Sequence, residues 1–333
     1  MALKVAVIGG GSWGTTMASV VARNCPTTLW ARDLETVKEV NNSHSNSKYL
    51  KGLILNKKLK ANNSLPETVK DADVIIMAIP SQYYRSVLNE TKEFIRPWVP
   101  IVSLTKGIEQ GTCLRMTEII KEILPEHPVG VLTGPNLARE ILQGQAAASV
   151  LAMVDTNIAQ ALQKIFRSGL FRVYTNDDLI GCELGGALKN VIAIAVGMGD
   201  GAGAGDNTRA TMITRGLAEL TRLGVALGGK APTFAGLAGM GDLLATCISP
   251  LSRNRQVGLQ LGAGKGIKQI IEEMSMVAEG VKTSGVVLEL AKKHNVEMPI
   301  TSEVFKVVNG KCTVQDAFKG LLKRETGAES EPG

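Results

Sequence analysis

A glycine-rich turn near the start of the sequence constrains the fold more than any other feature. Glycines occupy the first, third and sixth positions of Gly9-Gly10-Gly11-Ser12-Trp13-Gly14. The turn directly follows a strand-like run at residues 4–8 and opens a helical pattern at residues 13–24. The first two of these glycines permit a tight turn in which backbone N–H groups approach a pyrophosphate, and the third lets the helix pack on the strand. In this strand-turn-helix context the motif predicts a dinucleotide-binding site.

The pattern that continues from this turn predicts an α/β N-terminal domain. Short β-branched runs predict strands at residues 4–8, 27–32, 73–79, 100–104, 129–132 and 148–154. Helical patterns between them predict helices at residues 13–24, 34–41, 83–94 and 117–124. Strands that alternate with helices form parallel sheets, so a doubly wound, Rossmann-like parallel sheet is expected.

The second half of the chain has a different pattern, which predicts an all-α C-terminal domain. After Tyr174, helices are expected at residues 183–198, 208–223, 253–261, 267–274, 283–293, 300–308 and 313–322. The 333 residues exceed what one core usually covers, and a polar break occurs at residues 175–178. We therefore expect a dinucleotide-binding domain at residues 1–180 and a helical substrate domain at residues 181–324. Residues 325–333 lack apolar anchors, which predicts a disordered tail.

Charge, cysteine usage and hydropathy exclude several classes of function. The net charge of +6 is not gathered into a tract rich in lysine and arginine, so no nucleic-acid partner is expected. The five cysteines and three histidines show no metal-ligand spacing, so no metal is expected. The most apolar run, residues 191–198, is far shorter than the roughly 20 residues of a membrane span. Because the first strand begins at Lys4, no signal peptide is expected, and the predicted location is the cytoplasm.

The end of the second predicted strand bears on the choice of nicotinamide cofactor. Arg32 stands about 20 residues beyond the glycine loop, where NAD-binding chains commonly carry an acid for the ribose hydroxyls. An arginine there favours a 2′-phosphate, so NADPH is preferred over NADH. Asp33 follows immediately, and a shift of the strand end by one residue would exchange the two roles. A solvated charge at the strand end is the alternative interpretation of Arg32.

A lone lysine in an apolar helix is the strongest candidate for chemistry. Lys189 is the only charged residue between Glu183 and Asp200, and the predicted helix around it is apolar on every face, hence buried. A buried lysine is costly unless it is paired or used, and burial can lower its pKa towards values that suit proton transfer. The alternative is that Lys189 extends along the helix to the surface. No histidine lies near these groups in the sequence, so lysine chemistry fits better than a histidine base.

Two turns at strand ends could present polar groups to a ligand. Lys106 follows one predicted strand, and Thr133-Gly134-Pro135-Asn136 follows the next. Ligands of open α/β sheets lie outside the carboxyl ends of the strands, so Lys106, Gly134 and Asn136 are candidate substrate residues. A plain turn is the alternative for the second segment.

Two helix starts in the second half complete the candidate site. Asp242 and Thr246 are four residues apart and share a helix face, where Asp242 could hold a lysine ammonium group or simply cap the helix. Ser252 is a plausible cap for the following helix, whose first turn carries Arg253 and Arg255. Cations there oppose the helix dipole, and a bound anion would resolve the conflict. The pattern indicates a phosphate site, with surface arginines as the alternative.

Together these motifs resemble the NAD(P)-dependent glycerol-3-phosphate dehydrogenases, and the bacterial type that serves lipid synthesis most closely. The resemblance spans nearly the whole chain. Its specific parts are the segment Glu183-Leu184-Gly185-Gly186-Ala187-Leu188-Lys189-Asn190 and the step Ser252-Arg253-Asn254, whereas the glycine loop alone would match many dehydrogenases.

The resemblance implies reduction of dihydroxyacetone phosphate to sn-glycerol 3-phosphate by a cytoplasmic enzyme, with many members forming homodimers. It assigns proton transfer to Lys189. It implies substrate contacts at Lys106, Gly134, Asn136, Lys189, Asp242, Ser252, Arg253 and Asn254. It implies cofactor contacts at Gly9, Gly11, Ser12, Trp13, Gly14, Arg32, Lys106, Ala138, Arg253, Val277 and Glu279. Asn136 departs from the family pattern, since many members carry a smaller hydroxyl residue there.

Two other functions are compatible with the same fold. One is a related hydroxyacid dehydrogenase with a carboxylate substrate, which should not need a phosphate on its substrate. The other is a non-catalytic dinucleotide sensor, which should tolerate a neutral residue in place of Lys189.

Overall fold

The computed structural model describes residues 3–274, 278–324 and 328. The chain divides into two compact units, which we describe separately. The first comprises Met1–Lys106 and Leu114–Leu179, and the second comprises Gly107–Cys113 and Ile180–Gly333. Apart from residue 328, the tail predicted to be disordered lies outside the described residues.

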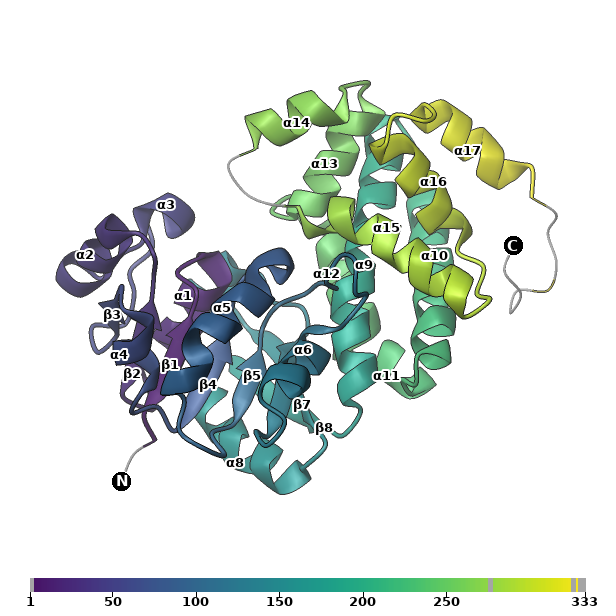
Figure 1. Ribbon diagram of the computed structural model, residues 1–333. Helices are drawn as coiled ribbons and strands as arrows, with labels where there is room; N and C mark the ends of the chain where they lie inside the picture. Colours follow the sequence, from purple (N-terminus) through teal and green to yellow (C-terminus); the bar gives the residue numbers. More distant parts are fainter. Residues whose placement is uncertain (1–2, 275–277, 325–327, 329–333) are drawn as a thin grey trace. The chain divides into compact units, whose positions relative to one another are not determined.

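The first unit is built on a sheet whose strands follow the order β3-β2-β1-β4-β5-β6-β7-β8 (Figure 1). Their bounds are β1 (Val5–Ile8), β2 (Thr27–Trp30), β3 (Lys60–Asn62), β4 (Val74–Met77), β5 (Ile101–Ser103), β6 (Val129–Thr133), β7 (Ala147–Met153) and β8 (Phe171–Asn176). The crossover from β3-β2-β1 to β4-β5-β6 is that of a doubly wound fold, which confirms the predicted fold class.

Helices cover both faces of this sheet. They are α1 (Ser12–Val21), α2 (Leu34–Ser43), α3 (Ser47–Leu50), α4 (Leu65–Val69), α5 (Tyr84–Thr91), α6 (Met116–Ile123), α7 (Ala138–Leu142) and α8 (Thr156–Phe166). Along β1, Val5 and Val7 belong to one core cluster with residues of α1, α7 and α8. Ala6 and Ile8 belong to another with residues of α4, α5 and α6. A strand that is buried on both faces has a continuous run of apolar residues, so these strands could be predicted from the sequence.

The expectation of an entirely parallel sheet is wrong at one place. β6 and β7 pair antiparallel, with Gly130 opposite Met153 and Thr133 opposite Val150, whereas the other neighbouring strands are parallel. The connection between them contains only the five-residue helix α7. A parallel pair needs a crossover that returns along the whole strand, and so short a helix cannot provide it.

Two strands of the sheet, β3 and β8, were not predicted from the sequence. β3 has three residues and no β-branched side chain. β8 lies at the edge of the sheet, where its buried and exposed residues alternate. Both carry weaker signals than the buried central strands.

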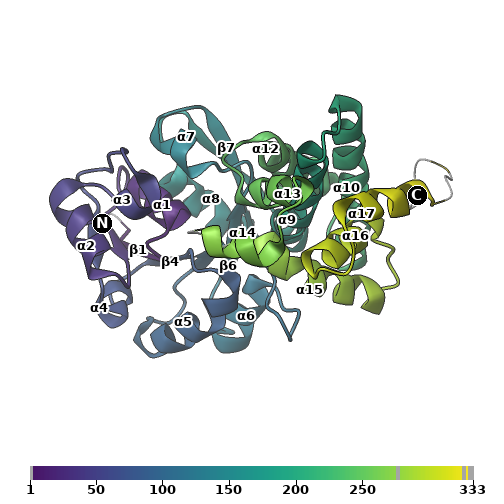
Figure 2. The same cartoon turned by 90° about the horizontal axis from the view of Figure 1, so that it is seen from above.

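The described residues of the second unit contain helices and no named strand, in line with the predicted all-α region. The helices are α9 (Leu179–Gly201), α10 (Asp206–Ala226), α11 (Ala231–Phe234), the π-helical turn η3 (Leu237–Gly241), α12 (Asp242–Ile248), α13 (Arg253–Gly262), α14 (Ile267–Glu273), α15 (Glu279–Lys293), α16 (Pro299–Val308) and α17 (Val314–Leu322). α9 is buried from Gly181 to Gly199 and is enclosed by the other helices of its unit (Figures 1 and 2).

Two helical segments have the length and hydropathy of a membrane span. They are α9, whose apolar window is 89% buried, and residues Ala231–Ile248, whose window is 44% buried. α9 is the core helix of its unit, and core helices of soluble proteins have the same composition. Its apolar surface is therefore explained by packing within the unit.

Candidate active site

Two glycines of the loop between β1 and α1 are required by the backbone. Gly9 has a φ of 127°, and a Cβ atom there would lie 2.4 Å from the Ala78 carbonyl oxygen. A Cβ atom on Gly14 would lie 2.0 Å from the carbonyl oxygen of Gly9, so a side chain would push the helix off the strand. At Gly11 a Cβ atom would meet no atom within 4 Å. Gly11 thus leaves open space at the start of α1.

That open space is suited to a phosphate group. Gly11 is the N-cap of α1, and no side chain caps the helix. The first N–H groups of a helix need acceptors, and a phosphate supplies them while also interacting with the helix dipole. The Trp13 indole nitrogen is buried without a hydrogen-bond partner among the described residues. The loop therefore fits the pyrophosphate-containing cofactor predicted from the motif.

Asn46 holds this loop in shape, although sequence reasoning missed it. Its amide nitrogen donates to the Gly10 carbonyl oxygen at 3.0 Å and to the Thr15 hydroxyl at 2.9 Å. Asn46 is buried and lies more than 30 positions along the chain from the loop. No local pattern could have indicated this contact.

The structure separates the roles of Arg32 and Asp33. Asp33 caps α2, where its carboxylate accepts from the Glu35 backbone N–H at 3.1 Å and from the Thr36 hydroxyl at 3.2 Å. The backbone hydrogen bond to Glu35 is the main reason that the pKa of Asp33 is lowered, with further help from Thr36 and Lys48. β2 ends at Trp30, and Arg32 is exposed beyond it. The carboxylate is thus engaged in the helix cap, while the arginine is accessible.

Polar groups gather beyond the carboxyl ends of β5 and β6. The Lys106 ammonium group donates to the Gly134 carbonyl oxygen at 2.9 Å. The Asn136 side-chain oxygen accepts a hydrogen bond from Ser149 of β7. The Asn136 amide nitrogen and the Thr133 hydroxyl are buried without a partner among the described residues. Buried polar groups of this kind are rare in native proteins and indicate a missing ligand or water.

The Lys189 side chain is buried and paired in the second unit. It is 5% exposed, and its Nζ lies 2.9 Å from Oδ1 of Asp242, which is 2% exposed. Lys189 also donates to the Thr246 hydroxyl, which in turn donates to the Asp242 carbonyl oxygen at 2.7 Å. The lysine does not extend to the surface. Gly241 is the N-cap of α12, so the Asp242 carboxylate faces the lysine and does not cap the helix.

Close packing brings the lysine and its carboxylate together. A Cβ atom at Gly185 of α9 would lie 2.6 Å from the Ala238 carbonyl oxygen in the π-helical turn η3. The glycine therefore lets η3, and α12 after it, approach the α9 backbone directly. Burial raises the pKa of the neighbouring Cys247 thiol to about 12, so this thiol keeps its proton and is a weak acid.

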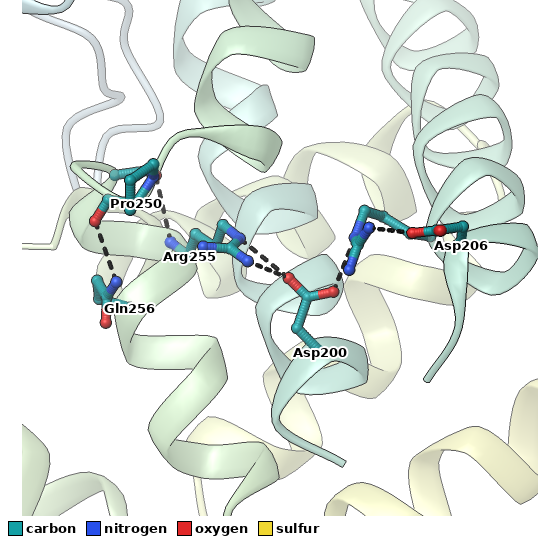
Figure 3. A network of polar contacts seen from close by, with 7 residues as sticks. Asp200, Asp206, Pro250, Arg255 and Gln256 are labelled. Atoms are coloured by element: carbon teal, nitrogen blue, oxygen red, sulfur yellow. Dashed lines mark hydrogen bonds and ion pairs between the residues drawn. The ribbon is translucent and has the colours of Figure 1, made fainter. Parts of the chain in front are cut away.

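The two arginines at the start of α13 have different surroundings. Ser252 caps the helix by accepting from the Arg255 backbone N–H at 3.3 Å, as predicted. Arg253 is exposed at this end. Arg255 instead directs its guanidinium group to Asp200 of α9, with contacts of 3.0 Å from Nε and 2.6 Å from Nη2 (Figure 3). The dipole conflict at Arg255 is thus resolved within the protein.

Asn254 connects three elements of the second unit. Its amide nitrogen donates to the Asn190 side-chain oxygen at 3.0 Å, and its side-chain oxygen accepts from the Gly280 backbone N–H at 2.9 Å. Asn190 follows Lys189 on α9, and Gly280 lies in the first turn of α15, which begins at Glu279.

Among the other predicted cofactor residues, Ala138 begins α7, and Val277 lies outside the described residues. In the described part of the chain, no group of three or more metal-binding side chains is found.

Comparisons with known proteins agree over the whole chain. Residues 4–159 match the family model for the NAD-dependent glycerol-3-phosphate dehydrogenase N-terminus, and residues 178–319 match the model for its C-terminus. The glycerol-3-phosphate dehydrogenase [NAD(P)+] 2 of Sphingopyxis alaskensis is 63% identical over 333 residues, all of both chains. A glycerol-3-phosphate dehydrogenase [NAD(P)+] of Mycobacterium tuberculosis is 54% identical over 327 residues, 98% of this chain and 96% of its own.

Solved structures give the same result. The glycerol-3-phosphate dehydrogenase of Coxiella burnetii has a TM-score of 0.92 and 36% identity, covering 97% of this chain and 99% of its own. A ketopantoate reductase from Ralstonia eutropha has a TM-score of 0.61 at 16% identity over 95% of this chain and 100% of its own, a likeness that shows the fold alone. The resemblance seen in the motifs is confirmed, and the chain belongs to the NAD-dependent glycerol-3-phosphate dehydrogenase family.

Proposed function

We propose that this chain reduces dihydroxyacetone phosphate to sn-glycerol 3-phosphate with NADPH or NADH, and so feeds glycerophospholipid synthesis. Family membership over the full chain supports the reaction. The observation that carries the chemistry is the buried contact of Lys189 with Asp242 and Thr246 in the core of the second unit. Burial of an ion pair costs desolvation energy, and buried charged groups of this kind cluster at functional sites.

Proton transfer is the role assigned to Lys189. Reduction of a ketone to an alcohol adds a hydride to carbon and a proton to oxygen. A reduced nicotinamide held by the first unit would supply the hydride. The Lys189 ammonium group donates the proton to the developing alkoxide, while Asp242 and Thr246 fix the direction of its remaining N–H bonds. Lys106, which donates to the Gly134 carbonyl oxygen within the first unit, keeps its predicted role as a substrate and cofactor contact.

Phosphate recognition is assigned to the start of α13. N–H groups at a helix start and a guanidinium group together suit a phosphate, and Arg253 stands in the first turn of α13. Ser252 and Asn254 flank Arg253, and Asn254 keeps a second amide hydrogen beyond the one given to Asn190. Binding energy from the phosphate then positions the ketone for reaction.

The cofactor is assigned to the first unit, with a preference for NADPH. The open start of α1 receives the pyrophosphate, and the exposed Arg32 receives the 2′-phosphate. The engagement of Asp33 in the cap of α2 supports this preference, because its carboxylate is already bound to the helix. We assign the domain boundary to residues 180–181, and we propose a homodimer in the cytoplasm by likeness to the family.

One assay tests the reaction and its main rivals. Purified protein is mixed with NADPH and either dihydroxyacetone phosphate or dihydroxyacetone, and the loss of reduced nicotinamide absorbance is followed. We expect rapid oxidation only with the phosphorylated ketone, because removal of a desolvated charge-assisted contact costs about 2–5 kcal/mol. Equal rates with both ketones, or turnover only with 2-oxo acids, would reject the proposal in favour of a carboxylate dehydrogenase. Binding of NADPH without turnover of any ketone would favour a sensor.

A further inference from the structure

The Asp200 carboxylate joins three helices of the second unit. It lies in the last turn of α9, and its side chain is 5% exposed. Arg255 of α13 approaches one carboxylate oxygen with both Nε and Nη2 (Figure 3). Arg209 of α10 approaches the other oxygen with Nε at 2.9 Å. Charge-assisted contacts of this kind are among the strongest hydrogen bonds in proteins. Arg209 also contacts Asp206, at 2.5 Å, whose side chain is 93% exposed.

Helix electrostatics indicate that this contact is more than a surface ion pair. A carboxylate in the last turn of a helix and a guanidinium group in the first turn are both disfavoured by their own helix dipoles. Asp200 and Arg255 occupy these two unfavourable positions, on α9 and α13 respectively. Pairing them removes both penalties and also satisfies the buried carboxylate. The pair therefore fixes the end of α9 to the start of α13.

The two helices also touch through their backbones. A Cβ atom at Gly197 of α9 would lie 2.2 Å from the Arg255 carbonyl oxygen, and one at Gly258 of α13 would lie 2.1 Å from the Ile194 carbonyl oxygen. Neither position has room for a side chain. The side-chain contact between Asn190 and Asn254 is a second connection between the same helices.

The substrate requires a fixed geometry between these helices. Covalent bonds set the distance from the phosphate of dihydroxyacetone phosphate to its ketone oxygen. Lys189, the proposed proton donor, lies on α9, and the proposed phosphate residues Ser252, Arg253 and Asn254 lie at the start of α13. A small displacement of one helix along the other would move the two groups out of register with the substrate.

We propose that Asp200 is a positioning residue for the phosphorylated substrate, acting through Arg255 to hold the start of α13 against the helix that carries Lys189. This inference rests on the proposed function. Asp200 touches neither the substrate nor the cofactor in this role. Its effect is confined to the phosphate end of the substrate, so dihydroxyacetone, which has no phosphate, is insensitive to it.

The test compares Asp200→Asn with a matched control, Asp206→Asn. The control removes a carboxylate from the same network without touching α13. The measurements are kcat and KM for dihydroxyacetone phosphate, KM for dihydroxyacetone, and the calorimetric Kd of sn-glycerol 3-phosphate. We expect Asp200→Asn to raise KM and Kd for the phosphorylated ligands about tenfold, or about 1.4 kcal/mol, with kcat little changed. We expect the control to match the parent, and KM for dihydroxyacetone to be the same in all three proteins.

Several results would overturn the inference. They are an unchanged Kd for sn-glycerol 3-phosphate in Asp200→Asn, an equal rise in KM for dihydroxyacetone, or an equal effect of Asp206→Asn. If Asp200→Asn does not fold, Arg255→Lys serves instead, because it keeps a cation for Asp200 and loses the two-pronged contact. It should raise the same Kd by a smaller factor, and an unchanged Kd would reject the role. If the parent enzyme reduces dihydroxyacetone phosphate and the variants bind sn-glycerol 3-phosphate normally, only this inference is rejected. If the parent enzyme is inactive, the proposed function is rejected instead.

Discussion

Substitution of Lys189 by methionine tests the proton donor most directly, and the structure shapes how the test must be done. Methionine keeps an unbranched apolar chain in the buried α9, so the packing around the side chain is preserved. Loss of a general acid costs about 10²–10⁴-fold in rate, and loss of the positive charge near the alkoxide adds to this. We therefore expect kcat to fall by at least about 10³-fold while NADPH binding, assigned to the first unit, stays normal.

The same substitution affects stability, because it leaves Asp242 without its lysine. Removing one partner of a buried ion pair typically costs about 3–5 kcal/mol. For a unit of this size, 1 kcal/mol shifts the melting temperature by about 2–4 °C, so a decrease on the order of 10 °C is expected. A loss of activity in the single variant could thus reflect partial unfolding as well as lost chemistry.

The double variant Lys189→Met/Asp242→Asn separates these two effects. An amide at position 242 removes the buried charge that the methionine no longer balances, so most of the lost melting temperature should return. Activity should not return, because the proton donor is still missing. The assay is kcat from the loss of reduced nicotinamide absorbance, with NADPH affinity and melting temperature measured on the same preparations. A double variant with near-parent melting temperature and near-parent kcat would refute the role of Lys189.

Three further predictions concern other parts of the chain. Arg32→Ala should raise KM for NADPH about 10- to 100-fold, because one hydrogen bond to a charged group is lost, and should leave KM for NADH nearly unchanged. Similar increases in KM for both cofactors would contradict the assignment. Arg253→Ala should reduce kcat/KM for dihydroxyacetone phosphate about 30- to 5,000-fold, equivalent to about 2–5 kcal/mol, without lowering the melting temperature, and an unchanged KM would reject the phosphate site. Burial raises the pKa of Glu219 to about 7, even though it accepts hydrogen bonds from Ile300 and Thr301 at the start of α16. Because its folded-state pKa lies above the unfolded value, its contribution to stability is fully present below about pH 4.5 and is lost as the pH rises through about 7. Glu219→Gln should therefore reduce the difference in melting temperature between about pH 5 and about pH 8, and an unaltered difference would show that another group is responsible.

Features that depend on nearby residues were predictable from the sequence. The glycine loop could be recognised because two of its glycines answer local requirements, the positive φ of Gly9 and the contact of Gly14 with the Gly9 carbonyl. The burial of Lys189 followed from its apolar neighbours on every face of one helix. The antiparallel β7 could not be predicted in the same way, since its direction depends on the length of the returning connection and not on the composition of the strand.

Contacts between distant residues were beyond local patterns. Asp242 and Thr246 share a helix face in the sequence, but only the structure brings them to Lys189, more than 50 positions earlier in the chain. Asn46 and Ser149 stabilise the site from other elements, and their local sequences carry no signal of it. Such contacts depend on how the elements pack, which propensity and periodicity do not encode.

An ion pair inside the protein gives Arg255 a structural role that its sequence position alone does not reveal. Arg253 and Arg255 occupy the same first turn, and the argument from the helix dipole applies equally to both. The structure gives Arg255 a buried carboxylate, which occupies the Nε and Nη2 side of its guanidinium group. By contrast, the Trp13 indole and the Thr133 hydroxyl are buried without partners among the described residues, beside the glycine loop and at the end of β6. We therefore expect ligand contacts at Trp13 and Thr133, as at Arg253, and not at the carboxylate-paired side of Arg255.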